Sequence, residues 1–248
     1  MLRVTANTQL MREIVDILSD LTEEAKMSWG EKGLTVNVVD GSHVALLSAT
    51  ISDACFETYE CEPVEIGMEL GKLRDLLTLA GPSDLVEIDY DDAVGAVNVR
   101  VGQVHRILRR LDTNSMSDPK LPVLDFGCSA TIDAEKLSRS LRAAKFVGEL
   151  VDLSLDSKEL RVSVTVEAGE GVNVSFESGE LIELTCPSPT QGTYSLQFLD
   201  PLTRKLASGL ASDVQVRFQD KYPLRLDWSS NDGGASWTYF LAPRVTND

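Results

Sequence analysis

No stretch of this sequence approaches the run of about 18 apolar residues that crosses a bilayer. The first residues, MLRVTANTQLMREIVDILSD, turn acidic too early for a signal peptide. Hydrophobic residues make up 43% of the chain and charged residues 25%, which is the balance of a globular protein. We therefore expect no membrane contact, and a protein that stays in the compartment where it is made.

Cysteine and histidine are scarce, and the common catalytic motifs are missing. Cys55, Cys61, Cys128 and Cys186 form no C-x-x-C pair, and only two histidines accompany them, which argues against a zinc site. There is no phosphate-binding loop, no dinucleotide fingerprint and no G-x-S-x-G elbow. The acidic cluster Asp89–Asp92 could bind a divalent cation, but we interpret it as a solvated hairpin end. We predict a protein that is not an enzyme and holds no cofactor or metal.

Positive charge is also in short supply. The 39 acidic residues outnumber the 23 lysines and arginines, which gives a formal net charge of -16. The phosphate backbone repels such a surface, which argues against nucleic-acid binding by the whole surface. Binding by one locally basic face is not excluded. A large acidic excess also suits a salt-rich, halophilic cytoplasm.

Strand patterns dominate what is present. Runs such as GLTVNVVD, AVNVRV, VNVSFES and LRLDW alternate or are rich in β-branched residues, and turn residues separate them. This predicts an α+β fold made mainly of antiparallel sheet. Four segments have helical periodicity: about Asn7–Thr22, Leu70–Leu79, Asp133–Val147, and Asp200–Ser208 with Pro201 at its first helical position.

The order of these segments repeats. Each half reads strand, helix, several strands, helix and more strands, with a period of roughly 125 residues, the size of one ordinary domain. We infer a tandem duplication of one α+β domain. The stretch LDTNSMSDPKLPVLDF holds turn formers and two prolines and reads as an extended linker. The predicted domains are therefore residues 1–110 and 127–248, joined by the linker 111–126.

One helix stands out for its charge. The segment KLSRSLRAAKF contains four cations and no acid, and Leu137, Leu141 and Ala144 define its buried side. Arg139 and Arg142 then lie side by side on the opposite face. A solvated helix face would explain this helix alone. The last three helices together, however, hold eight cations and four acids, while the first shows Arg12 among Glu13, Asp16 and Asp20. This segregation favours helices that face a polyanion.

Several motifs resemble the archaeal and eukaryotic sliding clamp, the proliferating cell nuclear antigen family. DGSHVALLSATISDACFETYECE is similar to its D-x-S-H-V-x-L…F-x-x-Y-x-C stretch, and GKLRDLLTLAGPSDLVEI to its second helix and the following turn. GVNVSFESGEL resembles its G-V-x-F-x-x-x-G-E-L strand and turn. YPLRLDWS followed by WTYFLAPRV is similar to its C-terminal ending. The resemblance covers the whole chain in order.

The resemblance implies a DNA-clamp fold, in which two tandem similar domains place helices on a ring interior and antiparallel sheets outside. In that family three chains close around double-stranded DNA, bind it without sequence specificity, and tether DNA polymerase, the clamp loader and other replication and repair proteins. The implied location is the cytoplasm, on the nucleoid, in an archaeon, and the nucleus in a eukaryote.

The resemblance also implies three sets of site residues. The DNA-binding set combines the basic positions of the family with other cations of the same helices: Arg12, Lys72, Arg74, Arg139, Arg142, Arg204 and Lys205. The groove that receives partner peptides is mapped onto Val39, Val44, Leu46, Leu121, Pro122, Phe126, Pro223, Phe240, Ala242 and Pro243. The subunit interface pairs two edge strands through Val104, Ile107, Leu108, Val172, Val174 and Phe176.

The sequence leaves alternatives open. Because the outward side of the first helix is acidic, one alternative function is a peptide-binding adaptor of the same fold that never encircles DNA. A subunit of a heterotrimeric or checkpoint-type ring fits the same motifs. A metal-dependent hydrolase built on Asp89, Asp91 and Asp92 lacks a nucleophile and a base beside that cluster.

Overall fold

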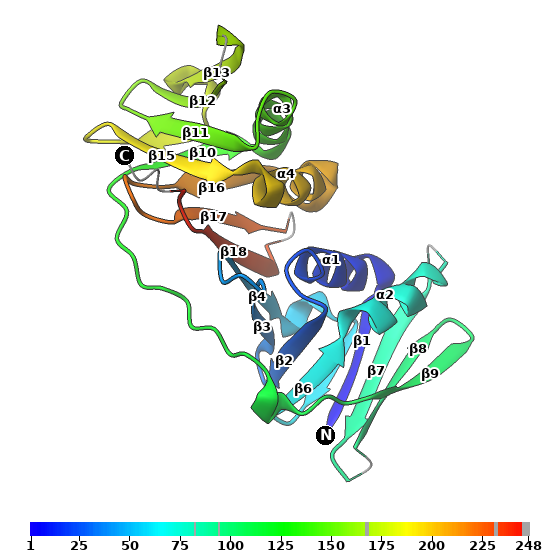
Figure 1. Cartoon of the computed structure of the whole chain (residues 1–248). Helices are drawn as coiled ribbons and strands as arrows, with labels where there is room; N and C mark the ends of the chain where they lie inside the picture. The colour runs from blue at the N-terminus through cyan, green and yellow to red at the C-terminus, as the bar shows by residue number, and fades with distance from the viewer. Residues whose placement is uncertain (82, 94, 167–168, 231–232, 245–248) are drawn as a thin grey trace. The chain divides into compact units, whose positions relative to one another are not determined.

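The computed structural model describes residues 1–81, 83–93, 95–166, 169–230 and 233–244. The chain divides into two compact units (Figure 1). We call unit 1 the residues Met1–Leu121 with 233–237, and unit 2 the residues Pro122–Ser230 with Thr238–Arg244. Pro82 and Val245, which belong to motifs quoted above, lie outside the described residues. None of the described helices is long and apolar enough to cross a membrane.

The elements of each unit follow the same order along the chain. Unit 1 contains β1 (Leu2–Asn7), α1 (Thr8–Leu18), β2 (Glu24–Gly30), β3 (Gly33–Val39), β4 (Ala45–Ser52), β5 (Thr58–Cys61), β6 (Val64–Glu69), α2 (Leu70–Thr78), β7 (Leu85–Asp91), β8 (Ala96–Val101) and β9 (Val104–Arg109). The second series consists of β10 (Ser129–Asp133), α3 (Ala134–Lys145), β11 (Leu150–Leu155), β12 (Glu159–Thr165), β13 (Gly171–Glu177), β14 (Glu183–Thr185), β15 (Thr190–Ser195), α4 (Leu196–Lys205), β16 (Asp213–Arg217), β17 (Leu224–Ser229) and β18 (Ala235–Leu241).

The strand pairing repeats as well. The first series holds the strand orders β5-β1-β7-β8-β9 and β4-β3-β2-β6, and the second holds β14-β10-β16-β17-β18 and β13-β12-β11-β15. Adding nine to each strand number of the first series gives the second. The registered pairings, such as β1 with β7 and β10 with β16, are antiparallel. The predicted α+β fold with two tandem similar halves is therefore confirmed.

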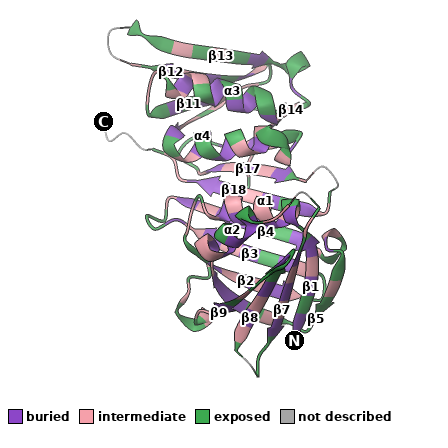
Figure 2. Cartoon of the chain, turned by 90° about the vertical axis from the view of Figure 1, so that its right-hand side faces the viewer, coloured by how far each residue is buried: buried purple, intermediate pink, exposed green. Residues whose placement is uncertain are grey.

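Alternating side chains build the core of each unit. Along β7, Val86, Ile88 and Tyr90 are buried, while the residues between them are at least partly exposed. The helices add their apolar sides: α1 contacts α2 in unit 1, and α3 contacts α4 in unit 2 (Figure 1). Figure 2 shows buried and exposed residues on different sides of α3. Each helix pair thus leaves an outer face available to solvent or a ligand.

The helix boundaries show where the periodicity was informative. α1 begins after Asn7, whose side chain accepts the backbone N–H of Leu10, but it ends at Leu18. The expected continuation to Thr22 was too long, because Ser19 and Asp20 are weak helix formers and the chain turns there. α3 begins after Asp133 as predicted, and the Asp133 carboxylate accepts the backbone N–H of Lys136 at 2.9 Å.

The prediction for the fourth helix was wrong at its start. α4 begins at Leu196, four residues before the expected Asp200, so Pro201 lies inside the helix. Leu196, Leu199 and Leu202 are buried, and their spacing extends the apolar side towards the N-terminus. This packing offsets the hydrogen bond that Pro201 cannot donate.

The linker has little regular structure but is attached to unit 1 at its beginning. Leu111 forms an isolated antiparallel bridge with Gly67 of β6, and a short 3-10 turn follows at Thr113–Ser115. Lys26 of β2, whose side chain is 10% exposed, pairs with Asp118 at 2.8 Å and Glu65 at 3.5 Å. The hydrogen bond to Asp118 raises the pKa of Lys26 above its ordinary value.

Candidate DNA-binding and partner-binding surfaces

The outer face of α3 carries the strongest positive charge of the described helices. Leu137, Leu141 and Ala144 are buried as predicted, and Arg139 and Arg142 are exposed. No hydrogen bond or ion pair joins either guanidinium to another residue that the structure describes. Two unengaged arginines side by side on one helix are suited to bind phosphate oxygens.

The cations that flank these arginines are engaged within the unit. Lys145 pairs with Glu149, and the Lys136 ammonium lies 3.4 Å from the Glu180 carbonyl. On α4, Arg204 pairs with Asp200 at 2.6 Å, one turn earlier, and the Asp200 side chain is 10% exposed. Lys205 is half-buried at the end of α4. A phosphate that binds Arg204 or Lys145 must therefore share it with a carboxylate.

Unit 1 presents a different helix surface. Glu13 and Asp16 lie six and nine residues after the N-cap of α1, and Arg139 and Arg142 lie six and nine residues after the N-cap of α3. Unit 1 therefore has two acidic residues at the helix positions where unit 2 has two arginines. The guanidinium of Arg12 donates to the carbonyl oxygens of Leu77 at 2.8 Å and Ala80 at 3.1 Å.

The α2 cations of the DNA-binding set differ in availability. Lys72 pairs with Glu69 at 2.7 Å. Arg74 is exposed, without a hydrogen bond or ion pair to another described residue. Within the DNA-binding set, the cations without a described partner are therefore Arg74 in unit 1 and Arg139 with Arg142 in unit 2.

A buried aspartate organises the first part of the predicted peptide groove. The Asp40 carboxylate accepts the backbone N–H groups of Ser42, Val44 and Ala45 at 2.9, 2.7 and 2.6 Å. Burial alone would raise the pKa of Asp40, but these three hydrogen bonds outweigh it, and the pKa lies below its ordinary value. The turn also holds His43 at φ 56. The aspartate of the D-x-S-H-V motif therefore holds the turn between β3 and β4, a role that the sequence motif alone did not indicate.

The apolar residues of that part lie close together in unit 1. Val39 and Leu46 are register partners on β3 and β4. Both are half-buried, as is Val44 in the turn held by Asp40. Leu121, at the end of the unit, is 42% exposed. Half-exposed apolar side chains on a hydrogen-bonded frame are suited to bind an apolar anchor.

Unit 2 holds the remaining groove positions. Phe126 contacts Tyr222 with ring centroids 6.1 Å apart, and Pro122 and Pro223 are half-buried. Phe240 is only 4% exposed and lies 5.5 Å beneath the Arg225 guanidinium, so it supports the surface rather than forming it. Ala242 and Pro243 are half-buried.

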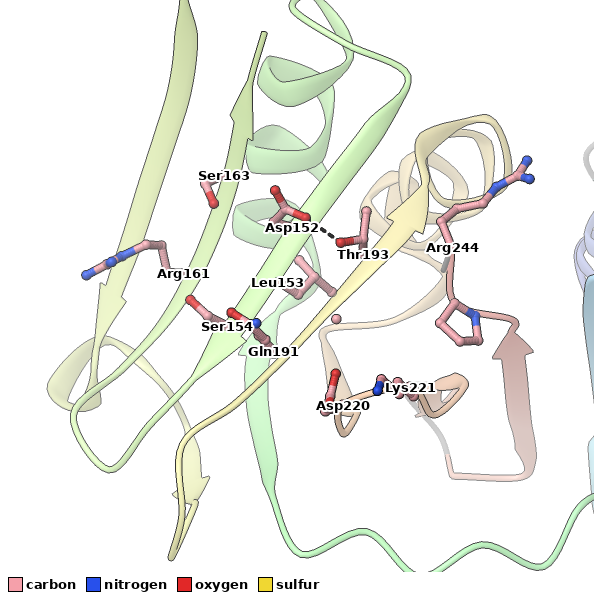
Figure 3. Close-up of a pocket in the computed structure, with 12 residues that line it drawn as sticks. Asp152, Leu153, Ser154, Arg161, Ser163, Gln191, Thr193, Asp220, Lys221 and Arg244 are labelled. Carbon is pink, nitrogen blue, oxygen red and sulfur yellow. Dashed lines mark hydrogen bonds between the residues drawn. The ribbon is translucent and has the colours of Figure 1, made fainter. Parts of the chain in front are cut away.

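A polar pocket of about 750 Å³ adjoins Pro243 in unit 2 (Figure 3). Its floor is the outer face of β12, β11 and β15, where the Thr193 hydroxyl donates to Asp152 at 2.5 Å. The backbone N–H of Arg244 donates to the Thr193 carbonyl at 2.8 Å, so Arg244 lies beside β15. The sequence analysis predicted no pocket here; the only signal was the alternation of polar and apolar residues along these strands.

The two predicted interface strands each end a sheet. On β9, Val104 is 39% and Ile107 64% exposed, whereas Leu108 is buried in unit 1. On β13, Val172 and Val174 are half-buried and Phe176 is buried in unit 2. Val174 and Phe176 line a hollow of about 300 Å³ together with Lys136, Arg139 and Ser140 of α3.

The acidic cluster Asp89–Asp92 forms hydrogen bonds and ion pairs with residues of unit 1. Asp89 pairs with Arg3 at 3.1 Å, and Asp92 accepts the Tyr90 hydroxyl at 2.7 Å and pairs with Arg110 at 3.2 Å. Across the residues that the structure describes, no three histidine, cysteine or acidic side chains are grouped as a metal site requires.

Two α+β units of one topology, each with a helix pair, define a DNA-clamp fold. Residues 1–116 match the family model described as the N-terminal domain of proliferating cell nuclear antigen. Over 247 residues the chain is 27% identical to the DNA polymerase sliding clamp of Haloarcula marismortui, covering 99% of this chain and 98% of that one. The sliding clamp of Natronomonas pharaonis is 26% identical, with 100% of both chains covered.

A solved structure described as the C-terminal region of FEN-1 bound to A. fulgidus PCNA matches with a TM-score of 0.92. It is 24% identical and covers 100% of both chains. The family model, the full-length relatives and the fold agree, so the resemblance to the sliding clamp is confirmed. The acidic composition that suggested a salt-rich cytoplasm also fits, since relatives from halophilic archaea are among those matched.

Proposed function

We propose that this chain is a DNA polymerase sliding clamp: a ring of three copies that encircles duplex DNA and tethers replication and repair enzymes. It acts by binding alone, and carries out no reaction of its own. The observation that carries the proposal is the outer face of α3, with Arg139 and Arg142 exposed and unengaged in a chain of net charge -16. Contacts to phosphates carry no sequence information, so such a ring slides along DNA.

Ring closure is supported by the two sheet ends, β9 and β13. Each offers main-chain hydrogen-bonding groups and half-exposed apolar side chains, including Val104 and Val174. β9 carries His105, Arg106 and Arg109, while Glu177 ends β13. Opposite charges favour head-to-tail pairing between copies, and a closed ring leaves no free sheet edges.

Partner binding is supported by two apolar surfaces, Val39 with Leu46 in unit 1 and Phe126 with Tyr222 in unit 2. Short peptides with aromatic anchors, carried by polymerases, the clamp loader and repair enzymes, would bury their side chains there. The solved relative from A. fulgidus is bound to the C-terminal region of FEN-1.

A peptide-binding adaptor that does not encircle DNA remains the second candidate, and the acidic outer face of α1 favours it. The two candidates differ on polymerase stimulation. With a clamp loader and primed circular DNA, we expect the wild-type protein to increase the length of polymerase products.

The test variant is Arg139→Glu with Arg142→Glu, which should abolish this stimulation and leave folding and assembly intact. The matched control is Arg161→Glu, because Arg161 is exposed on β12 between the buried Leu160 and Val162 and so lies on the sheet face away from α3. Equal stimulation by the double variant and the control would overturn the assignment of α3.

A further inference from the structure

Phe146 is the most exposed aromatic side chain among the described residues. It is 80% exposed, whereas Trp29, Trp228 and Trp237 are at most 4% exposed. Phe146 makes no ring contact with another described aromatic residue. Full burial of a phenylalanine side chain contributes about 1.5–3 kcal/mol, and at this position the fold gains little of that. Such an exposed ring needs an explanation outside the core of unit 2.

The position of Phe146 links it to the cationic face. Phe146 is the C-cap of α3 with helical backbone angles, φ -70 and ψ -19, and its N–H still donates to the Ala143 carbonyl. The helical geometry therefore continues to this residue. Phe146 follows Arg142 by four residues and Arg139 by seven, a spacing that places all three on one stripe of the helix.

The charge around Phe146 indicates what would cover it. α3 carries four cations and one acid between Ala134 and Lys145, and the nearby Glu149 is paired with Lys145. This surface repels a cationic partner and attracts a polyanion. Phosphates alone do not require an aromatic ring, but the bases and sugars of a nucleic acid present apolar faces. Base stacking on aromatic side chains contributes about 1–3 kcal/mol per base.

We infer that Phe146 is a DNA-contacting residue that packs against the apolar face of a nucleotide whose phosphates are bound by Arg139 and Arg142. The inference rests on the proposed function, because it needs DNA to pass along α3. It adds a component of DNA binding that salt does not screen, since stacking releases no counterions. The nucleotide can belong to a duplex or to an unpaired strand, and the test separates these sources.

The direct probe is Phe146→Trp in the full-length protein. The three native tryptophans are buried, so the new indole reports from the surface. We expect its fluorescence to be quenched in low salt by a short duplex, by the single strand of the same sequence, or by a primer–template junction. The probe that quenches most identifies the nucleotide source. Val123→Trp is the control, because Val123 is fully exposed in the linker at 101% and should not respond.

Affinity and its salt dependence provide the second measurement. Phe146→Ala should weaken DNA binding about fivefold or more, with the slope of log K against log salt unchanged. Phe146→Leu should restore little, since it lacks the ring. Arg142→Gln should instead reduce the magnitude of the slope by about 0.9, the value for one lost phosphate contact.

The outcomes separate the two proposals. No quenching by any of the three DNA probes, together with unchanged affinity of Phe146→Ala, would overturn the role of Phe146. The sliding-clamp proposal would then stand if the Arg139→Glu, Arg142→Glu variant still fails to stimulate a polymerase. Stimulation by that double variant equal to wild type would overturn the clamp assignment of α3, and with it the premise for Phe146.

Discussion

The guanidinium of Arg12, in α1, lies 2.8 Å from the carbonyl oxygen of Leu77, in α2. It also reaches Ala80, just past the end of that helix, so one side chain satisfies two carbonyl groups near the α2 C-terminus. A cation is favourable at the negative end of a helix dipole. The residue predicted to contact DNA therefore also holds the two helices of unit 1 together.

Arg12→Ala should accordingly reduce the free energy of unfolding by about 1.5–3 kcal/mol, the loss of hydrogen bonds to a charged group. Urea unfolding measures this. Arg74→Ala is the control, since Arg74 is exposed on α2 without a described partner, and it should change stability by less than about 0.5 kcal/mol. Equal stability of the two variants would mean that the Arg12 hydrogen bonds contribute nothing.

Asp40 gives a prediction about pH. Its pKa in the folded protein is lowered, so the ionised carboxylate stabilises the fold above the unfolded-state pKa of about 3.9. That contribution is lost as the pH falls through the lower, folded-state pKa. The backbone N–H of Ser42 donates to the Asp40 carboxylate. In Asp40→Asn the side-chain NH₂ group, which is a donor, would face such a backbone N–H and the hydrogen bond would be lost.

We expect Asp40→Asn to cost about 1–3 kcal/mol at pH 7 and to lose part of the acid dependence of stability below pH ~4. Thermal unfolding followed from neutral to acidic pH measures both. The exposed Asp53, at the other end of β4, provides the control substitution Asp53→Asn. An unaltered pH profile in Asp40→Asn would contradict the account of the turn.

The ion pair between Lys26 and Asp118 gives a prediction about the linker. Asp118→Ala should change global stability by less than about 1 kcal/mol, because surface ion pairs contribute little and Glu65 remains beside Lys26. It should, however, free the linker locally, so tryptic cleavage after Lys120 should become several-fold faster. Asp125→Ala, which removes an exposed linker carboxylate without a described partner, should leave the cleavage rate unchanged.

Assembly can be tested at β13. Val174→Asp places a charge on the half-buried side of that edge strand, and sedimentation should then shift from three times 27.1 kDa towards the monomer. Ser175→Asp adds the same charge one residue later, on the opposite face of the strand, and should disturb the trimer less. A wild-type protein that sediments only as a monomer at micromolar concentration would contradict ring formation.

The sequence predicted elements whose signals are local. The helix from Ala134 was found because Asp133 caps it and Leu137, Leu141 and Ala144 repeat at helical spacing. The start of α4 was missed because Pro201 was interpreted as a first helical residue, whereas the burial of Leu196 decided the boundary.

Contacts between distant residues could not be predicted from local patterns. The hydrogen bond between Arg12 and Leu77 spans 65 positions, and nothing in the helix pattern distinguishes an arginine that caps a neighbouring helix from one that faces solvent. Asp40 was visible as part of a motif, but its three backbone hydrogen bonds depend on the left-handed turn at His43. The exposure of Phe146 was hidden, because an apolar residue at a helix end is usually buried.

The central claim is that three copies hold DNA by enclosing it. The most direct measurement loads the protein onto nicked circular DNA with a clamp loader, raises the salt concentration, and follows retention by gel filtration before and after a restriction enzyme cuts the circle. A topological link predicts that the protein stays on the closed circle in salt that screens the contacts of Arg139 and Arg142, and is released when the DNA is linear. Equal retention on circular and linear DNA, or release from both, would contradict encirclement.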